Sequence, residues 1–412
     1  MAHWVTRISW TLMPAACAGW LLAAAPAPAE QAGLSRAEVY RRAAALTDLG
    51  RRMFFDTRLS ASGRLSCASC HDPAFAYGPP NGRAVQLGGE DMRQSGPRAV
   101  PGLKYLRATP QFQEHYHDSD EEADESVDNG PTGGLTWDGR VDSGHAQARL
   151  PLLSPAEMAN ASVAAVVERA RAAGYDAELR RLFGETLFDD ADRAFDAITM
   201  AFESFEQDVA TFEPYSSKYD AVLAGKATLT EAEAHGLALF NDPAKGNCAS
   251  CHISERAKDG TPPQFTDHGL IALGVPRNPE IPANADPGYH DLGLCGPMRT
   301  DLQDRPEYCG LFKTPTLRNV ALRTTFFHNG AFHDLREVVR FYVQRDTNPE
   351  KWYPRAADGS VRKFDDLPAQ YHENVNMEPP FGGQPGDEPA LTDSEITDLV
   401  AFLRTLTDGY GT

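Results

Sequence analysis

The chain contains one pentapeptide twice, as Cys67-Ala68-Ser69-Cys70-His71 and again as Cys248-Ala249-Ser250-Cys251-His252. The pattern Cys-x-x-Cys-His is the attachment signal for a c-type haem. Its two thiols bond to the porphyrin, and its histidine becomes an axial ligand of the iron. A zinc half-site or a redox dithiol can also use Cys-x-x-Cys, but neither requires a histidine directly after the second cysteine. We therefore expect two covalently bound c-type haems.

The repeat places one haem motif in each half of a chain of 412 residues, a length that suits two domains. The stretch from Leu49-Gly50 to Phe54 before the first motif is loosely echoed by His235-Gly236 to Phe240 before the second. Helical periodicity dominates, whereas runs of alternating β-branched residues are scarce. We predict a mainly α fold with two cytochrome c-like haem domains, 30–225 and 226–412, joined by a helical linker. Stretches rich in proline and glycine, 259–311 and 373–388, are expected to be long loops at the haem edges.

Three segments carry specific helix signals. Ser35-x-x-Glu38 is typical of a capping box that opens a helix running towards Gly50, and Thr392-x-x-Glu395 opens the last helix. Gly409 follows that last helix at a position where a helix would stop. The linker has apolar residues at spacings of three and four, which predicts one long helix ending at Glu213-Pro214; they are Phe195, Ile198, Phe202, Phe205, Val209 and Phe212.

Residues 1–29 have the pattern of a cleaved secretory signal, with a basic residue, an apolar run and small residues at the end. Because c-type haem is attached outside the cytoplasm, we expect a periplasmic protein with no membrane anchor after cleavage. Cys295 and Cys309 flank a short loop, and in an oxidising compartment a disulfide between them is expected. The formal net charge of −19 excludes an electrostatic grip on nucleic acid or anionic lipid.

The reactivity of a haem depends on whether its iron has a free face. Between Asp72 and Glu114 the only candidate ligands are Lys104 and Met92, so the first iron lacks an obvious sixth ligand. Cleavage of peroxide at an open iron needs a carboxyl or amide group nearby to move a proton. Glu157 and Gln147 are candidates, but the residues alone do not distinguish Glu157 from an ordinary acid in the first turn of a helix.

Several ordered motifs resemble the bacterial diheme cytochrome c peroxidase family across nearly the whole mature chain. They are Leu49 to Ser60 before Cys67, Gly96-Pro97-Arg98, Trp137-Asp138-Gly139-Arg140, Phe265-Thr266-Asp267, Lys313 to Val320 and Phe327-His328-Asn329-Gly330. The resemblance implies that Trp137 lies between the haems and relays charge. It also implies that Glu157 is the distal acid and that Gln147 lies beside the peroxide site. The alternative for Trp137 is a buried aromatic core residue.

The resemblance is to the MauG/MbnH-like branch of that family, because Tyr342 stands where ordinary members have an axial methionine. A phenolate is a hard anionic donor that favours oxidised iron, so Tyr342 is expected to be the sixth ligand of the second haem. By periodicity alone, Tyr342 could equally belong to a helical core stripe with Leu335 and Val338. Leu87 replaces the histidine that ordinary members release on reductive activation, so the resemblance implies no reductive priming.

Other positions depart from the family pattern. Gly246 replaces the surface tryptophan through which MauG loses electron holes. Trp352-Tyr353 could relay the holes instead, or these two residues could be ordinary surface packing. The calcium ion that the family holds between the haems uses an asparagine, which is Ala99 here, and two backbone carbonyls, which would be those of Arg323 and Thr325. The resemblance therefore leaves calcium binding open.

Three functions are compatible with the sequence. The resemblance favours an enzyme that uses hydrogen peroxide, through a bis-ferryl state of both haems, to oxidise a tryptophan of a periplasmic partner protein. The second is a cytochrome c peroxidase that removes hydrogen peroxide with electrons from a small cytochrome or cupredoxin. The third is a diheme electron carrier without catalytic activity, which would need strong sixth ligands on both irons.

Overall fold

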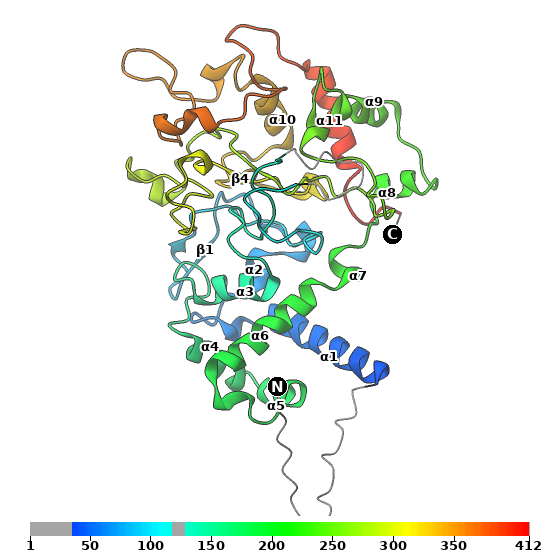
Figure 1. Cartoon of the computed structure of the whole chain (residues 1–412), viewed down its shortest axis with the longest axis vertical. Coiled ribbons are helices and arrows are strands. Elements are labelled where there is room, and N and C mark those ends of the chain that lie inside the picture. The colour runs from blue at the N-terminus through cyan, green and yellow to red at the C-terminus, as the bar shows by residue number, and fades with distance from the viewer. Residues whose placement is uncertain (1–34, 118–127, 412) are drawn as a thin grey trace, which may run out of the picture. The chain divides into compact units, whose positions relative to one another are not determined.

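A computed structural model describes residues 35–117 and 128–411, and in these ranges the regular secondary structure is mainly helical, as predicted, with long loops between the helices (Figure 1). The α-helices are α1 Arg36–Phe54, α2 Cys67–Cys70, α3 Gly144–Leu153, α4 Val163–Ala172, α5 Asp176–Phe183, α6 Ala191–Glu206, α7 Val209–Phe212, α8 Lys218–Leu223, α9 Glu231–Asn241, α10 Leu335–Gln344 and α11 Asp393–Arg404. The strands are β1 Leu87–Gly88, β2 Gln94–Ser95, β3 Leu270–Ile271 and β4 Phe312–Lys313. They form two antiparallel pairs, β1 with β2 and β3 with β4. The signal predicted at 1–29 lies outside the described residues.

By its contacts the chain divides into Met1–Tyr40 and Arg41–Thr412, and the larger unit contains both pentapeptides and two clusters of buried side chains. The N-terminal core runs from Leu49 to Phe212 and the C-terminal core from Tyr219 to Leu406. The domain boundary predicted near residue 225 stays a prediction. In the described part of the chain no helix is both long and apolar enough to cross a membrane.

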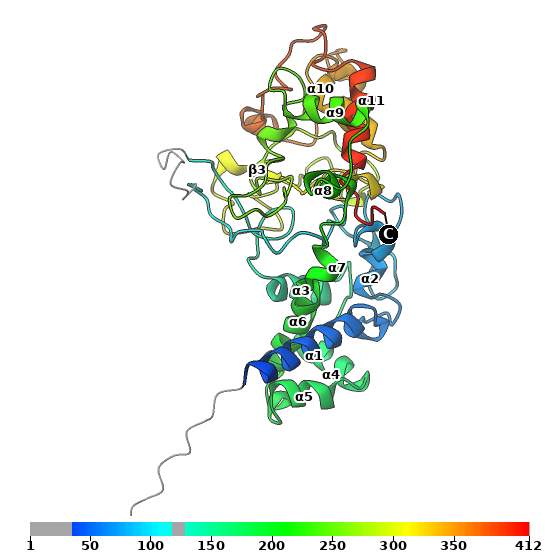
Figure 2. The same ribbon diagram turned by 90° about the vertical axis from the view of Figure 1, so that its right-hand side faces the viewer.

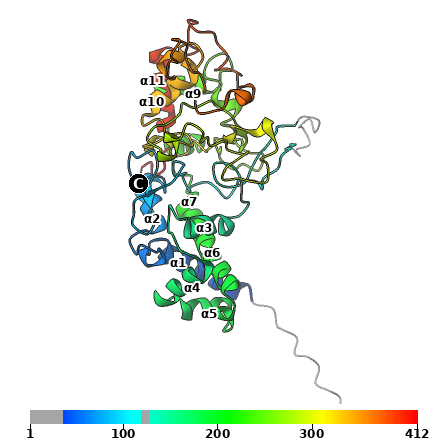
Figure 3. The ribbon, with the colours of Figure 1, turned by 90° about the vertical axis from the view of Figure 1, so that its left-hand side faces the viewer.

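The N-terminal core is built on α6, which packs against α3 and α4 (Figure 3). Asp190 caps α6 by accepting hydrogen bonds from the amides of Asp192 and Arg193. The prediction of one long helix is wrong at its end, because α6 stops at Glu206 and a separate turn, α7, begins at Val209. Asp208 is the N-cap residue of this new turn, and its carboxylate accepts a hydrogen bond from the Thr211 hydroxyl at 2.5 Å.

The C-terminal core is formed mainly by α9, α10 and α11, which lie side by side (Figures 1 and 2). Thr392 opens α11 with the predicted capping box, and Thr230 opens α9 in the same way. The apolar side chains of α11 and of the turn that follows it are buried: Ile396, Leu399, Val400, Leu403 and Leu406. The helix ends at Arg404, so Gly409 lies beyond its cap and instead donates its amide to the Ser216 carbonyl.

Two glycines bring pairs of helices into backbone contact. Helix α1 continues past Gly50 to Phe54, and a β-carbon at Gly50 would overlap the carbonyl oxygen of Ala201 on α6. A β-carbon at Gly236 on α9 would likewise overlap the carbonyl oxygen of Asp398 on α11. The similar segments before the two pentapeptides therefore share one structural feature, a glycine that allows a helix to cross its neighbour closely.

The predicted loops 259–311 and 373–388 contain no α-helix, and 259–311 carries only β3 and two short 3₁₀ turns. The predicted disulfide between Cys295 and Cys309 is confirmed. Strand β3 pairs with β4 in the register Leu270 with Lys313 and Ile271 with Phe312. This pairing fixes β4 beside the second pentapeptide, because Asp267, three residues before β3, donates its amide to the Cys251 carbonyl at 2.8 Å.

Candidate functional site

Both pentapeptides hold their histidine in the same way. His71 follows α2, and its Nδ1 donates to the carbonyl oxygen of Tyr77 at 3.1 Å. His252 follows a short 3₁₀ turn, and its Nδ1 donates to the carbonyl oxygen of Phe265 at 2.9 Å. A carbonyl oxygen can only accept, so Nδ1 carries the proton in each ring and Nε2 keeps a lone pair for a metal.

The charge state of these groups also suits a metal-bound haem. Burial lowers the pKa of His71 to about 4 and lowers the pKa of His252, so both imidazoles are neutral at neutral pH. Cys67, Cys70, Cys248 and Cys251 are free thiols, in contrast to the bonded pair in the 259–311 loop. Two free thiols beside a neutral imidazole are the groups that covalent attachment of a c-type haem requires. The residues present therefore fit two haems.

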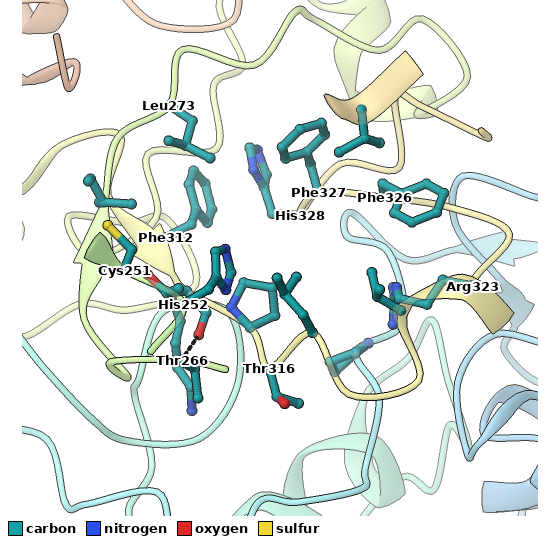
Figure 4. Close-up of a pocket in the computed structure, with 18 of the residues that line it drawn as sticks. Cys251, His252, Thr266, Leu273, Phe312, Thr316, Arg323, Phe326, Phe327 and His328 are labelled. Carbon is teal, nitrogen blue, oxygen red and sulfur yellow. Dashed lines mark hydrogen bonds between the residues drawn. The ribbon is translucent and has the colours of Figure 1, made fainter. Parts of the chain in front are cut away.

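A cavity of about 290 Å³ opens beside the second pentapeptide, and Figure 4 shows part of its wall. Cys248, Cys251 and His252 form one side of it. Apolar side chains of α10 and α11 form another; they include Leu335, Val338, Val339, Leu399 and Leu403. A cavity with this lining suits a flat, largely apolar ring that is anchored at one edge.

Tyr342 faces this cavity from α10 and lies near the second pair of thiols. Burial raises its pKa, and the nearby Cys251 and Cys248 thiols raise it further. Its ring lies between those of Phe381, with centroids 5.3 Å apart, and Phe327, with centroids 6.0 Å apart. Within 35–117 and 128–411 its hydroxyl makes no hydrogen bond. Tyr342 thus lines the same cavity as His252 with a polar group free to bind a ligand.

Trp137 lies in the wall of the same cavity and is 8% exposed. Its indole N–H donates to the Ala99 carbonyl at 2.8 Å, and its own carbonyl accepts from the Lys313 amide on β4 at 2.8 Å. These bonds fix the indole between a loop of the N-terminal half and a strand of the C-terminal half. The role of Trp137 as a relay between two haems stays a prediction.

A buried ion network supports the Trp137 turn. Arg98 donates to both carboxylate oxygens of Asp291, at 2.6 and 2.7 Å, and to Asp138 at 2.7 Å. Asp138 is fully buried and also accepts from Arg140 at 2.9 Å. The Arg98 guanidinium further lies 5.4 Å from the ring centre of Phe312, which stacks on His328 at 3.5 Å. The network therefore joins the Trp-Asp-Gly-Arg turn to the cavity wall.

Gln147 lies on α3 and lines the cavity together with Trp137. Glu157 follows α3 and does not line it; its backbone is held by Gly89, whose amide donates to the Glu157 carbonyl at 2.8 Å. Burial raises the pKa of the Cys67 and Cys70 thiols, and the nearby Glu157 carboxylate raises it further. Glu157 is exposed, and the protein packed around its carboxyl group raises the pKa of that group.

The predicted residues thus fall into two groups. Trp137, Gln147, Tyr342 and the second pentapeptide share one cavity, whereas Glu157 lies near the cysteines of the first pentapeptide. Leu87, at the position of the missing histidine, pairs in β1 with Ser95 of β2.

Sequence reasoning missed two titratable groups that are partly buried in the cavity wall. Glu206 lines the cavity, and burial raises its pKa to about 8. It lies four residues after Phe202, so the helical period already placed this acid on the aromatic face of α6. Lys313 is the second, with its pKa lowered by burial to about 7 and its ammonium bonded to the Gly134 carbonyl. Its only sequence signal was membership of the motif that runs to Val320.

The model of the di-haem cytochrome c peroxidase family, CCP_MauG, matches residues 44–228. The methylamine utilization protein MauG of Paracoccus denitrificans is 34% identical over 375 residues, covering 88% of this chain and 89% of that protein. The crystal structure of the diheme peroxidase BthA from Burkholderia thailandensis is 40% identical with a TM-score of 0.78, covering 88% and 86%. A MauG-like protein associated with microbial copper homeostasis is 27% identical with a TM-score of 0.58, covering 88% and 89%.

This chain belongs to the di-haem cytochrome c peroxidase family. It is therefore a haem-dependent oxidoreductase with two c-type haems, in agreement with the two pentapeptides. A member of this family uses hydrogen peroxide together with a partner protein or an electron donor. Because the family consists of enzymes, this membership excludes the third predicted function, a diheme electron carrier without catalytic activity.

The structure gives a physical reason for one departure from the family pattern. A β-carbon at Gly246 would lie 2.6 Å from the Leu239 carbonyl oxygen, so a tryptophan cannot be accommodated there without a backbone shift. Trp352 is half-buried, and its ring centre lies 5.6 Å from that of Phe341, which is 6.4 Å from Tyr342. Aromatic rings thus connect the Tyr342 side of the cavity with Trp352.

Proposed function

We propose that this chain is an exported, periplasmic diheme oxidase that uses hydrogen peroxide to oxidise a tryptophan side chain of a partner protein. The observation that carries the proposal is Tyr342, whose hydroxyl faces the cavity shared with His252 and the second pair of thiols. A methionine at this position would favour reduced iron, whereas a phenolate favours oxidised iron. The second site is therefore suited to holding an oxidising equivalent.

In this proposal, His71 and His252 would each hold the iron of one haem, and Tyr342 would be a further iron ligand at the second site. Each histidine is oriented by the carbonyl that accepts from its Nδ1, which makes Nε2 more basic. When bound, the haems supply peroxide reduction and hold its two oxidising equivalents until a substrate returns two electrons. The rings of Phe381 and Phe327 pack against the Tyr342 ring.

Glu157, near the first pentapeptide, is the proposed distal acid at the first site. Gln147 is the proposed second distal group, although the cavity that it lines is the one that also holds Trp137 and the second pentapeptide. The raised pKa of Glu157 favours a carboxyl group that can hold a proton and transfer it from the inner to the outer peroxide oxygen. The Gln147 amide can donate a hydrogen bond to the oxygen on which negative charge develops. Leu87 offers no competing ligand, which supports a first site that is open without prior reduction.

Trp137 is the proposed relay between the two sites. Its indole is held by a hydrogen bond to Ala99 and by the backbone of β4, so it needs no rearrangement to pass charge. The Arg98 network holds the neighbouring Asp138. Trp352 is the proposed exit towards the partner protein, because it connects through Phe341 to Tyr342.

The first experiment tests the proposal on the purified holoprotein. The ferric protein should show one high-spin and one low-spin haem by electron paramagnetic resonance. Peroxide added without reductant should then produce a near-infrared charge-resonance band. Trp137→Phe should weaken this band, and Tyr342→Met should abolish it while leaving the haem content unchanged.

The same experiment can contradict the proposal. Two low-spin signals in the ferric protein would exclude an open first site. A requirement for half-reduction before turnover, with electrons accepted from a small cytochrome or cupredoxin, would identify a peroxide-removing peroxidase instead. Oxidation of the partner is tested by mass spectrometry of a tryptophan-bearing periplasmic protein encoded by an adjacent gene, with and without peroxide.

A further inference from the structure

Arg323 is a partly buried cation that bridges the two halves of the chain through backbone oxygens. It follows the 3₁₀ turn Val320–Leu322 and lines the cavity opposite Cys251 and His252 (Figure 4). Its Nε donates to the Thr325 carbonyl at 3.1 Å, and a terminal nitrogen donates to the Val100 carbonyl at 3.0 Å. Within 35–117 and 128–411 no carboxylate pairs with it. Burial lowers its pKa to about 10, so it remains charged at neutral pH.

The guanidinium lies between groups that belong to both haem sites. Val100 follows Ala99, which accepts from the Trp137 indole and donates its amide to the His328 carbonyl at 2.7 Å. On its other side, a terminal nitrogen of Arg323 lies 3.8 Å from the place that a β-carbon on Gly78 would take, and Gly78 follows Tyr77, whose carbonyl accepts from His71 of the first pentapeptide. The positive charge of Arg323 is therefore close to groups that contact both Trp137 and His71.

The residues here do not fit the calcium ion that the family holds between its haems. Calcium takes six to eight oxygen ligands. Ala99 offers no side-chain oxygen, and its carbonyl is already bonded to Trp137. The Thr325 carbonyl, a second expected ligand, is bonded to the Arg323 guanidinium. Among the described residues, no group of three or more histidine, cysteine or acidic side chains could hold a metal ion either.

We infer that the Arg323 guanidinium takes the place of calcium as the fixed positive charge between the two haem sites of this chain. The charge is covalently part of the protein, so neither chelators nor changes in calcium concentration can remove it. The N–H groups of the Arg323 guanidinium also hold the Val100 and Thr325 carbonyls at a fixed separation. In other family members a calcium ion would hold the backbone here. The inference rests on the two haems and is independent of the proposed protein substrate.

The first test needs no variant. Holoprotein purified in the presence of calcium and passed through gel filtration should contain less than one tenth of an equivalent of calcium per two haems. Treatment with EGTA should leave the haem absorption and paramagnetic spectra unchanged. One equivalent of retained calcium, or spectra that change with EGTA and recover with calcium, would overturn the inference.

The second test removes the charge. Arg323→Gln should shift the reduction potentials of both haems to lower values, because an added electron loses a nearby cation, while Arg323→Lys should retain most of the native values. Arg256→Gln is the matched control, since exposed Arg256 also donates to two carbonyls, those of Gly260 and Leu223, but does not line the cavity. Equal potentials in Arg323→Gln and wild type would refute the electrostatic role even if calcium is absent.

Discussion

Replacing Arg98 with methionine should destabilise the chain strongly, because Arg98 is the cation of a buried network. Its side chain is 6% exposed, and its partners Asp138 and Asp291 are 0% and 8% exposed. Asp138 would keep Arg140, but Asp291 would lose both of its bonds from a cation. Removing one partner of a buried ion pair costs about 3–5 kcal/mol, since the remaining charge stays without compensation.

The assay is urea unfolding followed by far-ultraviolet circular dichroism, on samples matched for haem content. Arg51→Met is the control, because Arg51 pairs with Asp48 on the exposed face of α1 and such surface pairs contribute about 0–1 kcal/mol. The double variant Arg98→Met with Asp291→Leu should recover part of the loss, since it removes the orphaned carboxylate. If Arg98→Met lowers the free energy of unfolding no more than Arg51→Met does, the buried ion network of Arg98 does not stabilise the folded chain.

Three further variants test other features. Folded Glu206 keeps its proton up to about pH 8, whereas the unfolded chain releases it near pH 4.5. The free energy of unfolding should therefore fall as the pH rises between these values. Thermal scans at several pH values should show this fall in the wild type and not in Glu206→Gln. Gly236→Ala should cost about 1–3 kcal/mol, because its β-carbon overlaps the backbone of α11; an unchanged melting temperature would contradict the close crossing. Replacing Cys295 and Cys309 together with serine should cost about 3 kcal/mol, and the reduced wild type should match that variant.

The sequence predicted the features that depend on local chemistry. The pentapeptides, the capping box at Thr392 and the disulfide all rest on residues within a short stretch or on a single pair of thiols. The mainly α class followed from periodicity. Trp137 and Gln147 were drawn from resemblance, and the structure places both in one cavity wall with Tyr342. Their catalytic roles, like that of Glu157, stay predictions.

What the sequence could not reveal depends on contacts between distant segments. The linker pattern continues through Val209, but that residue is 48% exposed because the chain restarts as α7 after Asp208. Gly50 was expected near the end of a helix, and only the position of Ala201 shows that it permits a crossing. Arg323 was considered for its backbone oxygen, whereas its side chain is what occupies the space.

The two glycine crossings also limit how this molecule can change. At an ordinary helix contact, a larger residue on one side can be accommodated by a smaller one on the other. Gly50 and Gly236 meet main-chain atoms, which no substitution can shrink. A chimaera that exchanges α1 or α9 with a related segment should therefore assemble only when a glycine falls at the same register, whatever apolar residues surround it.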